Sequence, residues 1–156
     1  MKKSTKFIIA LLVTVGALAI TYRVVNQAPS KDLAADAQMQ EIITSGGCLQ
    51  CHSGSPDLPF YANWPVASGM VQKDVTQGYR AFDMTEMAEA LKAGKPVGKV
   101  ALAKVEKVIM DGTMPKHAYY MVHWGSSVTD AKKEMAMAWV KPVSYTHLRA
   151  HETTLH

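Results

Sequence analysis

The sequence has only two cysteines among its 156 residues, and they lie three positions apart. A framework of several disulfides, of the kind that stabilises small secreted domains, is therefore excluded. A zinc site built from two cysteine pairs is excluded for the same reason. Alternating polar and apolar segments that would predict β-strands are lacking, and no internal repeat occurs. These absences favour an all-α protein with one domain of ordinary size.

An excess of one charge is also lacking once the N-terminal segment is set aside. The formal net charge of the whole chain is +4, and the basic residues near the N-terminus are Lys2, Lys3, Lys6 and Arg23. Residues 24–142 hold 12 Lys and Arg against 12 Asp and Glu. Nucleic-acid binding requires clustered basic residues on the folded domain. We therefore expect no nucleic-acid partner.

Long hydrophobic runs are scarce, and the single clear one covers residues 7–20 (FIIALLVTVGALAI). As a helix it rises about 21 Å, which is less than the roughly 30 Å of a bilayer core. Extension to residue 25 lengthens the span and places Tyr22 and Arg23 where they can reach the membrane interface. We expect residues 1–6 to stay in the cytoplasm and residues 7–25 to anchor the chain in the inner membrane, with the rest periplasmic.

The alternative interpretation of this segment is a cleaved signal peptide, with a weak cleavage site at residues 17–19 (ALA). Both interpretations place the Lys-rich end in the cytoplasm and export the remainder. After the apolar segment, residues 26–31 are expected to form a linker and residues 32–142 the globular domain.

The C-terminal residues 143–156 lack apolar periodicity and a helix cap, although they contain three of the six histidines. Their sequence VSYTHLRAHET resembles a translated sequencing adapter more than a protein segment. We therefore set this tail aside as artefactual and expect the parent chain to continue beyond residue 142. A natural histidine-rich tail that binds metal is the alternative.

The two cysteines belong to a C-x-x-C-H motif at residues 48–52 (CLQCH), the attachment sequence of a c-type haem. Two thiols at this spacing can form thioethers with the same porphyrin, so Cys48 and Cys51 are the expected anchors. His52 then lies under the iron as its proximal ligand. The motif predicts one covalently bound haem c.

Two other uses of the cysteine pair fit the sequence less well. A disulfide between cysteines this close is strained and closes almost no loop. A thioredoxin-like redox pair would require a βαβ context, which the sequence does not show. Export of the domain agrees with haem, because c-type haem is attached on the outer side of the membrane.

The second axial position of the iron has several candidates. Met114 follows residues 111–113 (DGT) and precedes Pro115, which predicts a stiffened loop just after a helix end. His117 and His123 are alternatives that would give a bis-histidine haem, and an open or water-bound iron is a third possibility. A thioether ligand raises the reduction potential, whereas a second imidazole lowers it.

The other methionine candidates downstream of the motif are Met70, Met84, Met87, Met110 and Met121. Met84, Met87 and Met110 have helical spacing, which is typical of core positions. Helices are expected over residues 32–44, 83–94 and 98–111 and from residue 127 onwards, with a shorter one within residues 66–78.

Between the motif and the shorter helix, prolines and glycines predict an extended loop over residues 53–64. Tyr61 and Trp64 in this loop are candidates for contact with a haem edge or propionate, and simple core filling is the alternative. Arg80 is a third candidate, because its guanidinium matches a propionate carboxylate, although a lone arginine is more often solvated.

This order of elements resembles the class I cytochrome c fold, in which the first and last helices cross beside the haem. More narrowly, residues 42–140 resemble the haem-binding domain family of bacterial membrane-anchored cytochromes. The segments that carry the resemblance are residues 48–53 (CLQCHS), 61–66 (YANWPV), 73–75 (KDV), Gly78, Arg80, 112–115 (GTMP), 119–121 (YYM) and His123. The chain departs from the family pattern at Lys116, where a second proline is common.

The resemblance implies a monohaem domain that carries single electrons between redox partner proteins. The sequence shows no paired carboxylates and no nucleophile–base set, and a six-coordinate haem leaves no site for peroxide, so we expect no catalytic residues in this chain. Members of this family also occur upstream of dihaem cytochrome c peroxidase modules, so a C-terminal peroxidase module in the parent chain is an expected partner. The alternative function is a haem enzyme or gas sensor with an open distal position, in which His117 or His123 acts on the bound ligand.

Overall fold

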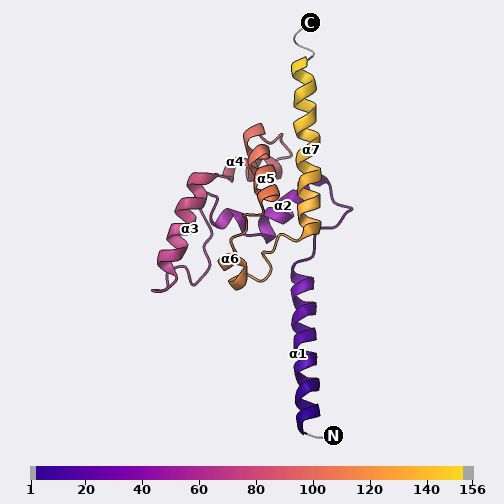
Figure 1. Ribbon diagram of the computed structural model, residues 1–156. Helices are drawn as coiled ribbons and strands as arrows, with labels where there is room; N and C mark the ends of the chain where they lie inside the picture. Colours follow the sequence, from indigo (N-terminus) through magenta and orange to yellow (C-terminus); the bar gives the residue numbers. More distant parts are fainter. Residues whose placement is uncertain (1–2, 153–156) are drawn as a thin grey trace.

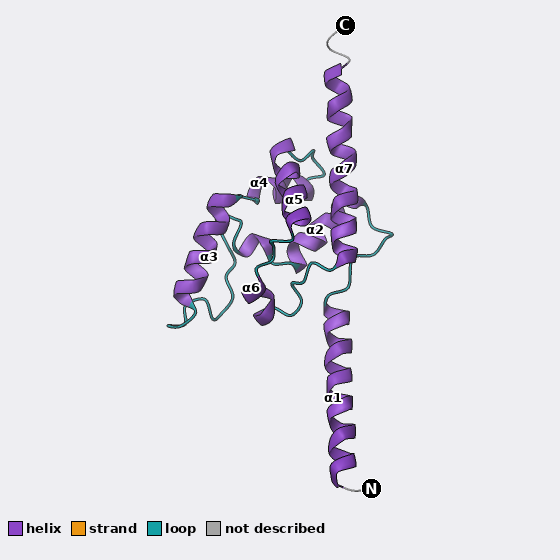
Figure 2. Cartoon of the chain, in the orientation of Figure 1, coloured by secondary structure: helices purple, strands orange, loops and turns teal. Residues whose placement is uncertain are grey.

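The computed structural model describes residues 3–152, with side chains described for residues 4–141. All regular secondary structure in the described residues is helical, which confirms the expected all-α class (Figures 1 and 2). The elements are α1 (Lys3–Val25), α2 (Ala35–Ser45), the 3-10 helix η1 (Cys48–Gln50), α3 (Ser68–Ala81), α4 (Thr85–Lys92), α5 (Lys99–Asp111), α6 (His117–Val122) and α7 (Asp130–Glu152).

Except for its last turn, helix α1 stands apart from the rest of the chain and points away from the helical domain (Figure 1). It is long and apolar enough to cross a membrane, and the most apolar part of it is not buried against any other segment. A signal sequence has the same length and composition. The structure is therefore compatible with the expected membrane segment.

The core of the domain lies where α2 and α5 pack against α7 and α4 packs against α2. Each of these helices has apolar residues three or four positions apart, so that one face of the helix is buried. The most buried core side chains are Met39, Ile42, Ile43, Met87, Leu102, Ala136, Trp139 and Val140. The indole Nε1 of Trp139 donates a hydrogen bond to Asp36 Oδ1 at 2.7 Å, which ties α7 to α2.

Some sequence-based expectations are confirmed and others are wrong in detail. Met84 and Met87 are buried as expected, but Met110 is 73% exposed, so its prediction as a core residue is wrong. Met110 follows Ile109, which packs against the core, and one residue of helix turns a side chain by about 100°. The short helix α6 was not expected from the sequence.

The last helix also differs from its expected bounds. It begins at Asp130, three residues later than residue 127, and its backbone remains helical to Glu152. The expected tail at residues 143–156 therefore continues the helix through residue 152, and its last four residues lie outside the described part of the chain. The expected linker at residues 26–31 begins with Asn26, which is 3% exposed and packs into the domain.

Candidate functional site

The C-x-x-C-H motif forms a tight turn immediately after α2. The last residue of α2 is Ser45, and Gly46 caps the helix. Gly47 follows in the left-handed region with φ of 64°, a conformation that glycine adopts without strain. The backbone N–H of His52 then donates to the carbonyl of Cys48 at 3.0 Å, which closes the turn. Both cysteine thiols are free and partly buried within this turn. The local backbone therefore brings Cys48, Cys51 and His52 together, as the sequence predicts.

The imidazole of His52 is held by a backbone carbonyl thirty residues later in the chain. Its Nδ1 lies 2.8 Å from the carbonyl oxygen of Phe82. In the neutral ring Nδ1 then carries the proton and donates it, so that the lone pair is on Nε2. Histidines that bind metals are commonly oriented in this way by a hydrogen bond from the other ring nitrogen. The residues present thus fit a proximal iron ligand.

A second backbone contact fixes the end of the motif. The N–H of Met84 donates to the carbonyl oxygen of His52 at 2.7 Å. The segment between α3 and α4 therefore contacts both the side chain and the backbone of His52. Sequence reasoning missed this segment, because backbone groups leave no signal in the amino-acid pattern.

Helix α3 approaches the motif closely because of a glycine. Gly78 is buried, and a Cβ at this position would lie 2.5 Å from the carbonyl oxygen of Cys51. Only a residue without a side chain allows this backbone-to-backbone approach. Gly78 was among the residues that carried the family resemblance, and its packing explains why the position suits glycine.

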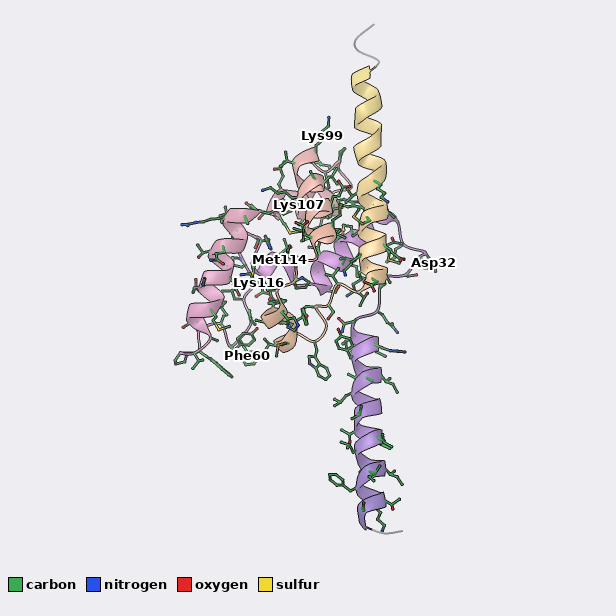
Figure 3. The ribbon with its side chains drawn as sticks, in the orientation of Figure 1. Asp32, Phe60, Lys99, Lys107, Met114 and Lys116 are labelled. Carbon is green, nitrogen blue, oxygen red and sulfur yellow. The ribbon has the colours of Figure 1, made fainter. Side chains whose placement is uncertain are left out.

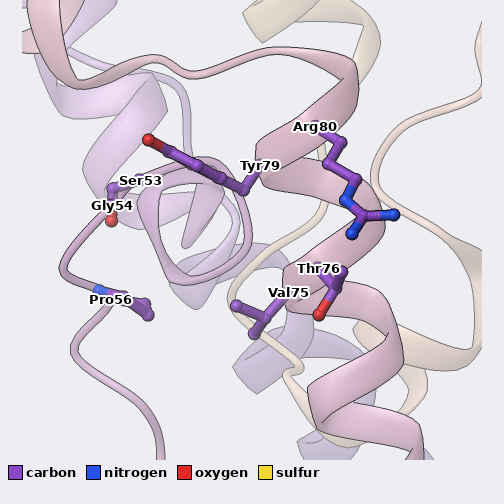
Figure 4. Close-up of a pocket in the computed structure, with 7 residues that line it drawn as sticks. All are labelled: Ser53, Gly54, Pro56, Val75, Thr76, Tyr79 and Arg80. Atoms are coloured by element: carbon purple, nitrogen blue, oxygen red, sulfur yellow. The ribbon is translucent and has the colours of Figure 1, made fainter.

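Arg80 follows Gly78 on the same helix and lines a small cavity beside the motif (Figure 4). The cavity has a volume of about 250 Å³ and is lined by Ser53, Gly54, Pro56, Val75, Thr76, Tyr79 and Arg80. Arg80 is exposed, so its guanidinium is accessible at the domain surface. At this position Arg80 can bind a carboxylate group beside Ser53, the residue that follows His52.

Burial affects the two thiols. Burial raises the pKa of Cys48 to about 11, and the nearby Cys51 thiol adds to the increase. Burial also raises the pKa of Cys51, with a further contribution from the Asp74 carboxylate. Both thiols are therefore protonated at neutral pH, whereas cysteines that exchange disulfides have lowered pKa values. This chemistry disfavours a thioredoxin-like redox pair.

Met114 lies partly buried on the loop between α5 and α6. Gly112 ends α5 in the left-handed region with φ of 61°. On the other side of Met114, the Nζ of Lys116 forms an ion pair with Asp74 Oδ1 on α3 at 2.6 Å. Met114 and Lys116 are labelled on this loop in Figure 3. Lys116, the position at which the chain departs from the family pattern, thus ties the Met114 loop to the helix that packs on the motif.

The two histidine alternatives differ in their surroundings. The Nε2 of His123 lies 2.7 Å from the Tyr61 hydroxyl, and its Nδ1 lies 3.0 Å from the carbonyl oxygen of Tyr119. In the neutral ring Nδ1 therefore carries the proton and donates it to that carbonyl, and the lone pair on Nε2 accepts a hydrogen bond from the Tyr61 hydroxyl, so the lone pair that iron would need is already engaged. His117 is exposed, and its ring lies 4.7 Å from that of Tyr120.

Tyr119 connects α6 with the attachment motif. Its hydroxyl donates a hydrogen bond to Gln50 Oε1 at 2.7 Å, and its ring stacks on His123 with centroids 3.9 Å apart. The hydroxyl occupies the space that a Cβ on Gly47 would need. Burial raises the pKa of Tyr119 to about 12. Sequence reasoning did not assign this role, although residues 119–121 were part of the resemblance.

The aromatic loop lies beside this cluster. The rings of Tyr61 and Trp64 contact each other edge to face with centroids 6.4 Å apart, and the Phe60 ring centroid lies 5.5 Å from each of theirs. Trp64 is 57% exposed, so it is not a core residue. The hydroxyl of Tyr61 is engaged by His123, as described above.

The comparisons with known proteins agree with this arrangement. The family described as "Haem-binding domain" matches residues 7–142. The cytochrome c peroxidase Ccp of Escherichia coli (strain K12) is 33% identical over 107 residues, which are 69% of this chain and 23% of that protein. The chain thus spans less than a quarter of the length of this relative. No solved structure matches the chain.

A match over most of the chain, together with the free thiols and the oriented imidazole of the motif, assigns the protein to a family. The chain belongs to the haem-binding domain family and is related to the N-terminal portion of a cytochrome c peroxidase.

Proposed function

We propose that the chain is a membrane-tethered monohaem c-type cytochrome domain that carries single electrons in the periplasm. The observation that carries this proposal is the hydrogen bond of His52 Nδ1 to the Phe82 carbonyl, which leaves Nε2 for the iron. A bound haem supplies an iron that alternates between the ferric and ferrous states. The protein residues attach this group, set its ligation and keep it at a fixed place near the surface.

In this proposal Cys48 and Cys51 provide the two thioether bonds and His52 is the proximal ligand. The turn of the motif supports these roles, because it presents two free thiols three residues apart next to the oriented ring. The raised pKa values of the thiols mean that the folded turn is a poor place for thiolate chemistry. Attachment is therefore expected before the domain closes around the motif.

Met114 is the proposed distal ligand. Three features support it: the glycine that ends α5, Pro115, and the ion pair of Lys116 that holds the loop against α3. His123 is the main alternative to Met114 as the distal ligand, and both of its ring nitrogens are already hydrogen-bonded within the protein. Trp64, Tyr61 and Arg80 are proposed to lie at the haem edge or near its propionates. Tyr61 contacts His123 and Trp64 contacts Tyr61, whereas Arg80 lines the cavity beside the motif.

The membrane tether is proposed on the basis of α1, which is kept as an anchor rather than removed. The weak cleavage site at residues 17–19 lies inside the apolar run, and the apolar pair Val24-Val25 follows it, which favours an uncleaved span. The last turn of this span is held by the domain, where Tyr22 and Asn26 form hydrogen bonds with residues 124–127. An anchor whose basic end stays in the cytoplasm places the haem domain in the periplasm.

A peroxidase module is the proposed electron acceptor. The 33% identical relative is named a cytochrome c peroxidase, and this chain corresponds to 23% of its length. We therefore propose that the domain delivers electrons to a peroxidase module that follows it in the parent chain. Other redox partner proteins would supply the electrons.

The test is the visible spectrum of the full chain, produced in a host that matures c-type haem. Covalent haem is checked by mass, because one haem adds the mass of one porphyrin to the chain. In the oxidised protein we expect the weak sulfur-to-iron charge-transfer band of an axial methionine. The variant Met114→Ala is expected to lose this band and to bind carbon monoxide readily in the ferrous state.

The matched control is Met110→Ala, because Met110 is 73% exposed on the neighbouring helix. This variant is expected to keep both the band and the resistance to carbon monoxide. A wild-type spectrum that lacks the band and does not change with Met114→Ala would contradict methionine ligation. Readily bound carbon monoxide in the wild-type protein would then favour the enzyme or gas-sensor alternative. A chain without haem would contradict the entire proposal.

A further inference from the structure

The junction between α1 and the haem domain is fixed by one buried amide side chain. Asn26 is 3% exposed, and its Nδ2 donates to the carbonyl oxygens of Trp124 at 2.6 Å and Tyr22 at 2.9 Å. Its Oδ1 accepts a hydrogen bond from the backbone N–H of Ser127 at 2.9 Å. Both amide donors and the amide oxygen are therefore used. A flexible linker would not bury and saturate a polar side chain in this way.

Two further contacts join the same segments. The hydroxyl of Tyr22 and Oγ of Ser127 lie 2.8 Å apart, and the ring of Tyr22 meets the edge of Trp124 with centroids 6.3 Å apart. The last turn of α1 and the loop between α6 and α7 therefore form one unit. Because α1 is the proposed membrane span, the direction of this helix also sets the orientation of the domain relative to a membrane.

The part of the domain near this junction contains no charged side chains over two long stretches. Residues 58–72 and residues 117–129 contain no Asp, Glu, Lys or Arg. The two stretches meet at the hydrogen bond between Tyr61 and His123. We call the surface formed by these two stretches the uncharged face. By contrast, residues 85–111, which form α4 and α5, contain nine charged residues.

Most of the large exposed side chains on the uncharged face are apolar, and Asn63, Gln72 and His117 are exposed polar residues on it. Its most exposed side chains include Phe60 (83%), Val66 (91%) and Val122 (70%), and Trp124 is 45% exposed. Figure 1 shows that α6 and the loop before α3 reach toward the end of the domain from which α1 leaves. In Figure 3, Phe60 lies at this end, whereas Lys99 lies at the opposite end.

We propose that the domain rests with its uncharged face on the bilayer that α1 crosses, and that Asn26 is the positioning residue that keeps it there. This inference rests on the proposed membrane tether. Tryptophan and tyrosine favour the membrane interface, so Trp124 and Tyr22 lie at the level of the lipid headgroups. Arg23 lies at the same level, where its side chain reaches the lipid phosphates. The uncharged face contains no Asp, Glu, Lys or Arg, so its contact with lipid does not carry the free-energy cost of removing a charged group from water.

The chemistry of the surface favours lipid over a protein partner. A redox partner that docks by charge would meet the lysine-bearing end formed by α4 and α5, which points away from the membrane in this orientation. Asn26 joins the uncharged face directly to the membrane span. The bilayer is therefore always close enough to contact this face.

The test places a fluorescent probe at two matched valines. Val122 on the uncharged face is 70% exposed, and Val100 on α5 is 72% exposed. In the haem-loaded full chain both native cysteines are used as thioethers, so Val122→Cys or Val100→Cys supplies the single reactive thiol. Each variant is labelled with an environment-sensitive fluorophore and placed in bilayers of phosphatidylethanolamine and phosphatidylglycerol. Nitroxide-bearing lipids serve as quenchers.

We expect the probe at residue 122 to emit at shorter wavelength and to be quenched by the nitroxide lipids. The probe at residue 100 is expected to retain aqueous emission and to escape quenching. Adding Asn26→Ala should lower quenching at residue 122 to the level seen at residue 100, because the orientation is released. The neighbouring change Gln27→Ala, at an exposed side chain, should leave the quenching unchanged. The visible spectrum of each variant checks that the haem domain is folded.

Aqueous emission at both positions in membrane-inserted protein would overturn this inference and leave the tether intact. A shift at residue 122 without quenching by lipid would also overturn it, because a second copy or a partner protein would then cover the face. Recovery of the chain in the soluble fraction, with a new N-terminus near residue 20, would refute the tether itself.

Discussion

The Nδ1 atom of His52 lies 2.8 Å from the carbonyl oxygen of Phe82, at the end of α3. The hydrogen bond joins the attachment motif to a segment thirty residues away and fixes which ring nitrogen is left for iron. Nothing in the amino-acid pattern around Phe82 indicates this partnership. It results from the close packing of α3 on the motif at Gly78.

Removal of the proposed proximal ligand tests this relationship directly. In His52→Ala the Phe82 carbonyl loses its partner and the iron loses its nitrogen ligand, so we expect haem content to fall and any bound haem to become high-spin. The measurement is the visible spectrum together with the haem-to-protein ratio. His117→Ala, at an exposed position, is the control and should keep the low-spin spectrum. A low-spin spectrum in both variants would refute the assignment of His52.

Gly78 offers a test of the close approach between α3 and the motif. In Gly78→Ala the new methyl group would lie 2.5 Å from the Cys51 carbonyl, so the helix must shift. We expect the free energy of unfolding to fall by about 1–3 kcal/mol, as for other overpacked positions. Chemical denaturation of the haem-loaded protein measures this loss.

Gly69 lies on the same helix, and a Cβ at this position would meet no atom within 4 Å. Gly69→Ala is therefore the matched control, and it should be neutral or stabilise the protein by up to about 1 kcal/mol. Equal destabilisation by the two substitutions would show that α3 tolerates no alanine at all, which would contradict the specific role of Gly78.

The ion pair between Lys116 and Asp74 is expected to matter for ligation more than for stability. The two side chains are 43% and 37% exposed, so Lys116→Gln should lower the free energy of unfolding by less than about 1 kcal/mol. Release of the loop from α3 should nevertheless weaken the methionine charge-transfer band. Asp74→Asn should have the same effect, and the double variant should add little to either single change.

Lys107 provides the control for this prediction. It forms an ion pair with Asp111 at 2.8 Å on the exposed side of α5, with a lysine side chain that is 76% exposed. Lys107→Gln should leave the charge-transfer band unchanged. A band of normal strength in Lys116→Gln would mean that Met114 is positioned without help from α3.

Tyr119 predicts a specific dependence of stability on alkaline pH. Burial raises its pKa to about 12, above the value near 10 of an exposed tyrosine, so the folded state holds the proton more tightly than the unfolded state. The contribution to stability is complete below pH 10 and is lost as the pH rises through 12. Tyr119→Phe lacks this proton and also the hydrogen bond to Gln50, so it should be less stable at pH 8.

The difference in unfolding free energy between wild type and Tyr119→Phe should therefore shrink between pH 10 and pH 12. Thermal unfolding of the haem-loaded proteins at pH 8, 10 and 11 measures it. Tyr120→Phe on the same helix is the control, because it keeps the Tyr119 hydroxyl and its hydrogen bond to Gln50. A difference that stays constant over this range would indicate that Tyr119 is not protected by burial.

The sequence by itself determined the features that depend on near neighbours. The motif at residues 48–52 indicates haem because its three functional residues are adjacent, and the structure adds the turn that groups them. The positions of α2, α4, α5 and the start of α7 followed from apolar spacing, since each of these helices buries one face. The bounds were less exact, and Met110 shows why: a single residue at a helix end separates a core position from a solvent position.

Tertiary structure alone decided which distant groups meet. Gly78 contacts Cys51, Lys116 pairs with Asp74, and Asn26 holds a loop almost a hundred residues later. These contacts involve backbone atoms or single polar side chains that follow no periodic pattern. Which groups meet is decided by how α3 lies against the motif and by where α6 and the loop before α7 lie in the fold. A motif can therefore be recognised from neighbouring residues, whereas the orientation of its imidazole requires the folded chain.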